Sequence, residues 1–339
     1  MEFEKIILCT DAPKGQGLAY YYYRAFCDVV GFEKISIIDE GNRNYGGSLF
    51  SRGVRRIKDR LGSLSKMKYG QLVESLSDTN NLVILFNNAG LKPIDIKKLS
   101  TNPSIDLVNY LSDSPYGLFA AQQKEVFSSI PYFKIICTFA IDLIPVLYQL
   151  GAKRVERIPF GYCKYTHLQP TENIAVEFPY KVFYFGTWSK EIEEWVKHLL
   201  VFDLVIEGNG WKNASRKELR EIGTRQRPNT DHNMAIMARK AGVVVNFTRS
   251  RHGCFHTMKT FELTISGACV ITNFSNEQNE FFKNEESIIY FNTAEEMTQE
   301  VRRFIHQNES SSKIKQNARV EAFKHSYHSR VTELLAVLK

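Results

Sequence analysis

Short β-branched runs alternate with amphipathic stretches along most of the chain, and this alternation restricts the possible fold more than any other feature. Runs of this kind are typical of buried strands in a parallel sheet that is covered by helices on both faces. In the first half the predicted strands span 5–10, 34–39, 82–86, 134–138 and 154–158. In the second half they span 181–185, 203–207, 243–247, 268–272 and 287–291. The sequence therefore predicts an α/β protein with two doubly wound, Rossmann-like halves.

The segment 169–179 separates these halves, because it carries two prolines and few periodic apolar residues. We expect an N-terminal domain over 1–172 and a C-terminal domain over 173–339. Helical periodicity over 294–305, 313–323 and 331–338 predicts terminal helices that cap the second domain, and the final helix is a candidate to return to the first. In such folds ligands bind at the carboxyl ends of the strands, so we expect the halves to face a central cleft.

The cellular compartment is predicted from three features of the sequence. The chain has no run of about 18 apolar residues and does not begin like a signal peptide. Its cysteines form no C-x-x-C pair and several lie in apolar runs, which indicates reduced core thiols. These cysteines are Cys9, Cys27, Cys137, Cys163, Cys254 and Cys269. We expect a cytoplasmic protein, with a peripheral position at the inner face of the membrane as an extension of that expectation.

The formal net charge of +7 is modest, but basic residues are concentrated between positions 52 and 68. The apolar residues Phe50, Val54, Ile57 and Leu61 share one side of a predicted helix over 50–61, which leaves its arginines on the other side. An ordinary surface helix would show this pattern, and so would a surface for an anionic membrane or for DNA. The basic residues are Arg52, Arg55, Arg56, Lys58, Arg60, Lys66 and Lys68, against the single acid Asp59.

A glycine-containing loop follows the first predicted strand and leads into a helix. Gly15 and Gly17 allow the backbone to approach a ligand closely, although a plain tight turn would use them too. The third glycine of the dinucleotide fingerprint is replaced by Tyr20, so we do not expect nicotinamide dinucleotide binding. We assign Gly15, Gly17 and Tyr20 to an acceptor loop. Asp11 stands after the first predicted strand and Asp113 after the apolar run 107–111, and both are the candidate catalytic bases if the reaction inverts the transferred centre.

A second polar loop, at 248–256, follows the predicted strand 243–247 and also leads into a helix. Arg249, Arg251 and the first amides of the helix, which begins near Thr257, suit the negative charge of a diphosphate. Glu262 follows Lys259 by nearly one turn and could accept hydrogen bonds from both hydroxyls of a ribose. A glutamate on a solvated helix surface is the alternative interpretation, but the neighbours of Glu262 are apolar.

The same loop contains His252, Cys254 and His256, a pattern that suggests metal binding. Gly253 argues for a loop rather than a helix, and a fourth ligand is not apparent nearby. The chain also has no D-x-D pair, the usual carboxylate clamp for a metal-bound nucleotide sugar. We therefore expect no metal, with the charge of a leaving diphosphate met by arginine, lysine and backbone amides.

Two further strand ends carry small and aromatic residues that could line a donor site. They are Gly186, Thr187 and Trp188 after one strand, and Gly208, Asn209 and Trp211 after the next. Either tryptophan could pack on a base or a sugar face. Burial in the core is the alternative for both.

In this order, the motifs resemble the CgeB-type glycosyltransferases, a family related to the large retaining families of the two-domain GT-B fold. The resemblance rests mainly on the stretch Asn246 to Gly267, with Lys259-Thr260-Phe261-Glu262 inside it, and on the closing His325 to Arg330. It implies that Glu262 binds the donor ribose and that the preceding loop holds the diphosphate. In the related retaining families a glutamate that contacts the donor sugar stands eight residues earlier, whereas this chain has Cys254 there.

These features together predict a metal-independent, retaining glycosyltransferase that uses a nucleotide sugar as co-substrate and needs no other cofactor. The first domain would hold a glycan or lipid-linked acceptor, and the second would hold the donor. Three alternatives remain open: a DNA-modifying glycosyltransferase, a nucleotide-sugar epimerase, and a nucleotide-sugar binding module that has lost catalysis.

Overall fold

The computed structural model describes residues 3–12, 15, 17–39, 63–117, 120–224, 231–248, 256–305 and 309–338. Contacts divide the chain into two compact units, Met1–Pro159 with Tyr327–Lys339, and Phe160–Ser326. The expected boundary at 172/173 falls inside the second unit. The basic helix expected over 50–61 lies outside the described residues, and so do Arg249 and Arg251.

The first unit is built on a parallel six-stranded sheet with the order β2-β1-β3-β4-β5-β6. Its strands are β1 (Lys5–Cys9), β2 (Ile35–Ile38), β3 (Asn81–Phe86), β4 (Ile105–Leu111), β5 (Ile135–Thr138) and β6 (Val155–Arg157). Its helices are α1 (Leu18–Val30), α3 (Ser63–Glu74), α4 (Pro93–Ser100), α5 (Ala120–Ser129), α6 (Leu143–Gln149) and α14 (Tyr327–Leu338). Strand β3 is buried along its whole length, as an apolar strand with helices on both faces should be. The fold predicted for this half is confirmed.

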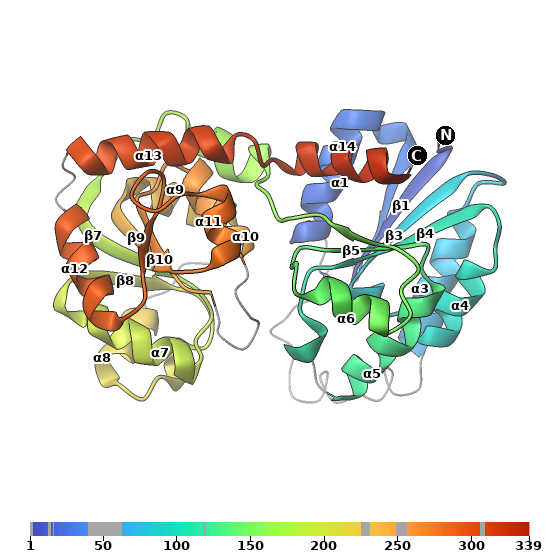
Figure 1. The fold of residues 1–339 in the computed structure, drawn as a ribbon, viewed down its shortest axis with the longest axis horizontal. Helices are drawn as coiled ribbons and strands as arrows, with labels where there is room; N and C mark the ends of the chain where they lie inside the picture. The colour runs from blue at the N-terminus through green and yellow to red at the C-terminus, as the bar shows by residue number, and fades with distance from the viewer. Residues whose placement is uncertain are drawn as a thin grey trace. The chain divides into compact units, whose positions relative to one another are not determined.

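The last helix of the chain belongs to the first unit. α14 packs beside α1, and the ring of Tyr327 stacks on that of Tyr21 with centroids 5.4 Å apart. In Figure 1 these two helices cover one face of the sheet, while α3 to α6 cover the other. Among the described helices, α1 and α14 thus form one layer from segments far apart in the sequence.

The second unit is built on a parallel five-stranded sheet with the order β11-β10-β9-β7-β8. Its strands are β7 (Phe178–Phe185), β8 (Asp203–Glu207), β9 (Ala241–Asn246), β10 (Val270–Asn273) and β11 (Ile289–Phe291). Its helices are α7 (Lys190–Val196), α8 (Lys217–Thr224), α9 (Asp231–Lys240), α10 (Met258–Ile265), α11 (Asn276–Phe281), α12 (Ala294–Phe304) and α13 (Glu309–Ala322). A cluster of buried side chains from α7, α8 and α12, with Trp211, packs on one face of this sheet. In Figure 1, α9, α10 and α13 cover its other face.

Two properties of the described residues bear on earlier expectations. Cys9, Cys27, Cys137, Cys163 and Cys269 are free thiols, and burial raises the pKa of Cys9 and Cys269 to about 12. Among the helices that the structure describes, none is both long enough and apolar enough to cross a membrane.

Candidate functional site

The order of strands in the second unit places a ligand position between β7 and β9. These strands are neighbours, yet the chain visits β8 on the far side of β7 before it returns to β9, so the direction of winding reverses between them. Open α/β sheets bind ligands outside the carboxyl ends of the strands at such a reversal. The loops that follow β7 and β9 start at Gly186 and Phe247, and both were selected from the sequence as candidate donor-binding segments.

The loops after β7 and β8 are held together by backbone hydrogen bonds. The amide of Gly186 donates to Glu207 O at 2.9 Å, and the amide of Trp188 donates to Asn209 O at 2.8 Å. Gly208 has φ +142°, and a Cβ there would lie 2.1 Å from the carbonyl oxygen of Gly186. Only glycine permits this approach. Thr187, between these contacts, is exposed.

The two tryptophans beside these loops have different positions. Trp211 has no exposed surface, its indole N–H donates to Gly186 O at 2.9 Å, and its ring packs edge-on against Tyr184. The expectation that Trp211 stacks on a base or a sugar is therefore wrong, because its ring is part of the core. Trp188 is partly exposed and its indole N–H donates to Glu193 Oε2 at 2.8 Å.

Glu193 is a buried carboxylate that sequence reasoning missed. It also accepts hydrogen bonds from the backbone amides of Ser215 and Arg216, at 2.6 and 3.1 Å. Burial by itself would raise the pKa of Glu193, but the hydrogen bonds from Trp188, Arg216 and Ser215 outweigh it and lower the pKa below its ordinary value. Glu193 thus ties the loop after β7 to the segment before α8.

Helix α10 brings two of the predicted donor-binding residues to this edge of the sheet. The backbone amide of Thr257 donates to Thr260 Oγ1 at 3.2 Å, which fixes the first turn. The ammonium group of Lys259 donates to the carbonyl oxygen of Phe185, the last residue of β7. A positive charge therefore lies at the point where the winding of the sheet reverses.

Glu262 is 3% exposed on the same helix, so the expectation of a solvated surface glutamate does not apply. Its Oε1 lies 3.6 Å from Nε2 of His167, whose side chain is fully buried. His167 comes from the π-helical turn Lys164–Leu168, far away in the sequence, and no sequence pattern indicates this pair.

His256 was considered as a metal ligand, but the structure gives it other partners. Its Nε2 accepts from the amide of Phe160 at 3.1 Å, and its Nδ1 lies 3.0 Å from Oε2 of Glu277. Both ring nitrogens are therefore engaged within the protein, and the ring packs among Phe160, Phe261 and Phe281. Among the residues that the structure describes, there is no group of three or more histidine, cysteine or acidic side chains placed to hold a metal ion.

The first unit has its own winding reversal, between β1 and β3. After β1, Asp11 is exposed, and Gly15 and Gly17 both have φ +77°, so the glycines supply a backbone conformation that other residues rarely adopt. The hydroxyl of Tyr20, on α1, donates to Oδ2 of Asp39 at the end of β2. Burial and this hydrogen bond raise the pKa of Tyr20 to about 12, so the phenol stays neutral.

The turn after β3 orients the candidate base Asp113, which follows β4. Asn87, Asn88 and Ala89 all have positive φ, an unusual run of left-handed residues without glycine. The side-chain amide of Asn87 donates to Ser112 Oγ at 2.7 Å and to Asp113 Oδ2 at 3.1 Å. Asp113 is thus exposed but oriented, in the same unit as Asp11.

Lys68 corrects one expectation about the basic segment. It is 2% exposed, and its ammonium group donates to the carbonyl oxygens of Thr10 and Ala89, at 2.8 and 2.7 Å. This lysine joins the ends of β1 and β3 and does not belong to a basic surface.

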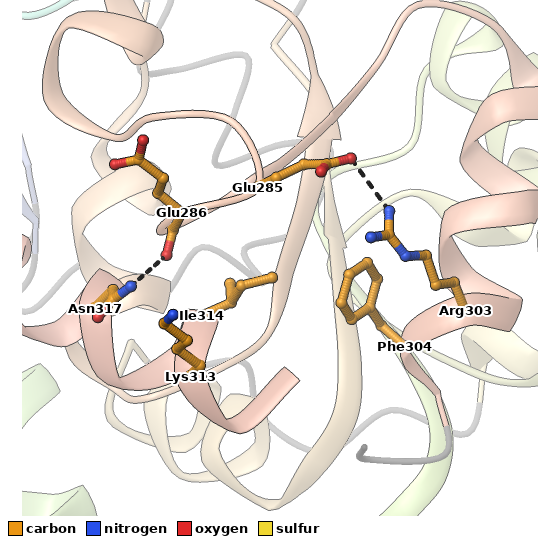
Figure 2. A pocket seen from close by; sticks show the side chains of 7 residues that line it. All are labelled: Glu285, Glu286, Arg303, Phe304, Lys313, Ile314 and Asn317. Atoms are coloured by element: carbon orange, nitrogen blue, oxygen red, sulfur yellow. Dashed lines mark hydrogen bonds and ion pairs between the residues drawn. The ribbon is translucent and has the colours of Figure 1, made fainter. Parts of the chain in front are cut away.

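A pocket of about 400 Å³ lies elsewhere in the second unit (Figure 2). Its lining residues are Glu285, Glu286, Arg303, Phe304, Lys313, Ile314 and Asn317. The guanidinium of Arg303 contacts Glu285 Oε1 at 3.2 Å, and the side-chain amide of Asn317 donates to Glu286 O at 2.9 Å. Glu285 and Glu286 precede β11, so this pocket lies at the amino ends of the strands, opposite the edge that carries Gly186 and Lys259.

Comparison with known families gives a match over most of the second unit and part of α14. Residues 189–336 match a family model described as glycosyl transferase-like. This part of the chain is similar to glycosyl transferase-like domains. It contains Lys259, Glu262 and the loop after β8, and glycosyl transfer is the enzyme class of the matched domain. No curated protein matches the chain by sequence.

Solved structures extend the comparison to the whole fold. Anabaena Alr3699/HepE in complex with UDP-glucose is 12% identical, with a TM-score of 0.67 over 98% of this chain and 99% of that one. Sucrose-phosphate synthase from Thermosynechococcus elongatus is 12% identical, with a TM-score of 0.67 over 99% of each chain. The N-terminal domain of trehalose-6-phosphate phosphatase from Candida albicans is 9% identical, with a TM-score of 0.67 over 99% and 96%. At these identities the likeness shows the fold, and the fold is GT-B.

Proposed function

We propose that this protein is a glycosyltransferase that takes a sugar from a nucleotide sugar, with a uridine diphosphate sugar as the first donor to test. The observation that carries the proposal lies in the matched domain. There Glu262 is buried on α10 while Lys259 of the same helix reaches the end of β7, where the winding of the sheet reverses. The complex of Alr3699/HepE with UDP-glucose, a structure with the same fold, supports the choice of uridine diphosphate.

The donor half of the proposed site uses residues of the second unit. Glu262 would accept hydrogen bonds from the ribose hydroxyls, and Lys259 would neutralise the diphosphate. Gly186 and Gly208 would let the backbone approach the ligand, and exposed Thr187 would bind it directly. The remaining proposed donor contacts are Asn209, Trp188, Thr257, Arg249 and Arg251.

We further propose a retaining, metal-independent reaction, as in the CgeB-type family that the sequence motifs resemble. The chain has no D-x-D pair to hold a metal ion at the diphosphate. Cationic side chains and backbone amides would therefore stabilise the departing diphosphate. The first unit would bind the acceptor, a glycan or a lipid-linked glycan, near Gly15, Gly17, Tyr20 and Asp113. If the reaction inverts instead, Asp113 or Asp11 would be the general base.

Calorimetric titration with uridine, guanosine, cytidine and thymidine diphosphate sugars tests the donor assignment. We expect binding of a uridine diphosphate sugar, and we expect Glu262→Ala to weaken it by about 1.5 to 3 kcal/mol, because it removes a charged hydrogen-bond partner. Glu321→Ala is the control, since Glu321 pairs with Lys324 on the exposed face of α13. Binding of none of these donors would contradict the proposal.

Turnover measured with excess chelator tests metal independence, and loss of turnover would refute it.

A further inference from the structure

A buried imidazole faces the carboxylate that we assign to the donor ribose. His167 is fully buried and Glu262 is 3% exposed, and the atoms that face each other, Nε2 and Oε1, are 3.6 Å apart. His167 lies on a single turn of π-helix, a local conformation that often occurs at functional sites. The two residues come from segments almost a hundred positions apart in the sequence, so their meeting is a property of the fold.

The hydrogen bond at the other ring nitrogen sets the protonation of His167. Nδ1 accepts the backbone N–H of Cys163 at 3.0 Å, so it carries no proton. The neutral ring must then carry its proton on Nε2, the nitrogen that faces Glu262. A charged imidazolium would need a second proton at Nδ1, where it would meet the N–H of Cys163. The contact with Glu262 is therefore between a neutral N–H group and a carboxylate oxygen, and at 3.6 Å it is longer than a formed hydrogen bond.

The backbones of the two residues are fixed to each other as well. The hydroxyl of Ser266 donates to Glu262 O at 2.6 Å and lies 3.3 Å from His167 O. Thr171 Oγ1 adds a hydrogen bond to His167 O at 3.2 Å. The ring of His167 and the helix that carries Glu262 thus hold a constant separation, which a group that orients another must have.

We propose that His167 is a positioning residue that orients the Glu262 carboxylate for a ribose, and that it thereby sets the preference for ribonucleotide over deoxyribonucleotide donors. This inference rests on the proposed function. An N–H group directed at Oε1 limits rotation of the carboxylate and leaves its remaining lone pairs directed at the ligand. A ribose has two neighbouring hydroxyls to donate to them, whereas a 2′-deoxyribose has one. Orientation of the carboxylate therefore affects binding of the ribonucleotide more.

Titration of the full chain with UDP and with 2′-deoxy-UDP measures this preference. We expect the wild type to bind UDP roughly tenfold or more tightly than 2′-deoxy-UDP, which is the scale of one charged hydrogen bond. His167→Asn keeps an acceptor for Cys163 but cannot reach Glu262, so the preference should fall to about one third or less. His167→Gln places an amide N–H near the position of Nε2 and should restore most of the preference.

His256→Asn is the matched control, because it likewise replaces a buried imidazole of the same unit that pairs with a glutamate, here Glu277 at 3.0 Å. We expect it to leave the ratio of the two affinities unchanged. If the wild type binds no uridine diphosphate, the uridine donor assignment fails and this inference with it. If the wild type prefers UDP and His167→Asn keeps the full preference, the inference alone is overturned.

A spectroscopic measurement on the wild type covers the case in which His167→Asn does not fold. The ¹⁵N resonances of the His167 ring should report a protonated Nε2 and an unprotonated Nδ1. UDP should shift the Nε2 resonance more than 2′-deoxy-UDP does. Equal shifts with both nucleotides, or a proton on Nδ1, would overturn the assignment.

Discussion

At the scale of single residues, the polar side chains of the second unit are held by partners from other elements. Glu193 on α7 accepts from Trp188 and from amides before α8, and His256 bridges Phe160 and Glu277. Burying these polar groups costs little free energy of folding when every hydrogen-bond partner is present. Removing one partner leaves a buried donor or acceptor without a hydrogen bond, which lowers stability. The stability of the loops around Gly186 should therefore depend on the charge of Glu193.

Glu193→Gln should lower the free energy of unfolding by about 2 kcal/mol at neutral pH, because an amide is a weaker acceptor and brings an N–H group with no acceptor assigned to it. The pKa of Glu193 is lowered in the folded state, so its contribution is complete above the unfolded pKa of about 4.3 and disappears as the pH falls through the folded pKa. Denaturant titrations of both proteins from pH 7 to pH 3 should show curves that converge at the acid end.

Glu194→Gln is the control for this titration, since Glu194 is solvated and pairs only with Lys197 at the surface of α7 among its described contacts. It should leave the free energy of unfolding nearly unchanged across the range. A constant difference between wild type and Glu193→Gln down to pH 3 would contradict the role assigned to the charge.

Candidate site residues could be selected from the sequence where a local pattern carried the chemistry. Lys259 and Glu262 follow a polar loop at the start of a helix; in the structure Lys259 contacts the end of β7 and Glu262 is buried on the same helix. His167 and Glu193 were missed because their partners are brought to them by the fold. Lys68 and Trp211 were misjudged for the same reason, since sequence does not show which side of an element faces the core.

At the scale of secondary-structure elements, most strands of both sheets were predictable from short apolar runs such as those of β3 and β9. The central strand β4 (Ile105–Leu111) was not among the predicted strands. The three terminal helices were predictable from the helical spacing of their apolar residues. What the pattern could not give was the unit to which each helix belongs: α12 and α13 pack in the second unit, while α14 packs in the first. Neither could it decide the role of the predicted basic helix over 50–61, which the structure does not describe.

We expect this basic helix to bring the protein to an anionic membrane. Replacement of Arg55, Arg56 and Arg60 by glutamate should then weaken binding to anionic vesicles, and the effect should shrink as salt rises. Replacement of Phe50, Val54 and Ile57 should weaken vesicle binding too, because interfacial helices bury their apolar face.

A parallel titration with duplex DNA tests the alternative, in which the predicted basic helix binds DNA instead of a membrane. Binding to DNA would fall steeply and linearly with the logarithm of salt, and would depend little on the apolar residues. Lys97 and Lys98, exposed on α4, provide the control for charge reversal elsewhere. Vesicle binding that is unaffected by the triple reversal would refute the membrane role.

At the scale of the whole molecule, the fold could be predicted as two parallel α/β units, but their limits could not. The chain leaves the first unit at Pro159 and re-enters it at Tyr327, so the first unit is made from two separate segments. Near the crossing, the amide of Tyr162 donates to His325 O at 3.0 Å, and Tyr162 forms an isolated bridge with Ser326. Hydrophobic periodicity shows where helices form, and it does not show which sheet they cover.

Deletion of residues 327–339 should unfold the first unit and leave the second intact. It removes the buried side chains of Tyr327, Val331, Leu334 and Leu338. Each contributes about 1.5 to 3 kcal/mol, and together they match the whole stability of an ordinary domain. Hydrogen exchange should lose protection in β1 to β6 and keep it in β7 to β11.

Thr332→Ala is the matched control, since Thr332 is exposed on the same helix, and it should leave exchange unchanged in both units. Retained protection of β1 and β3 after the deletion would show that α14 is dispensable. Titration with UDP would add a second measurement, because the proposed donor residues all belong to the second unit.

Because α14 returns to the first unit, it also sets the order in which the two units can fold during translation. Residues 160–326 leave the exit tunnel as one continuous stretch and can form their sheet while translation continues. The first unit, although its β-strands are made earlier, must wait for the closing helix with one face of its sheet incompletely covered. Residues before 160 are thus synthesised before the second unit but completed after it. A nascent chain stalled before residue 327 is expected to expose the α1 face to chaperones.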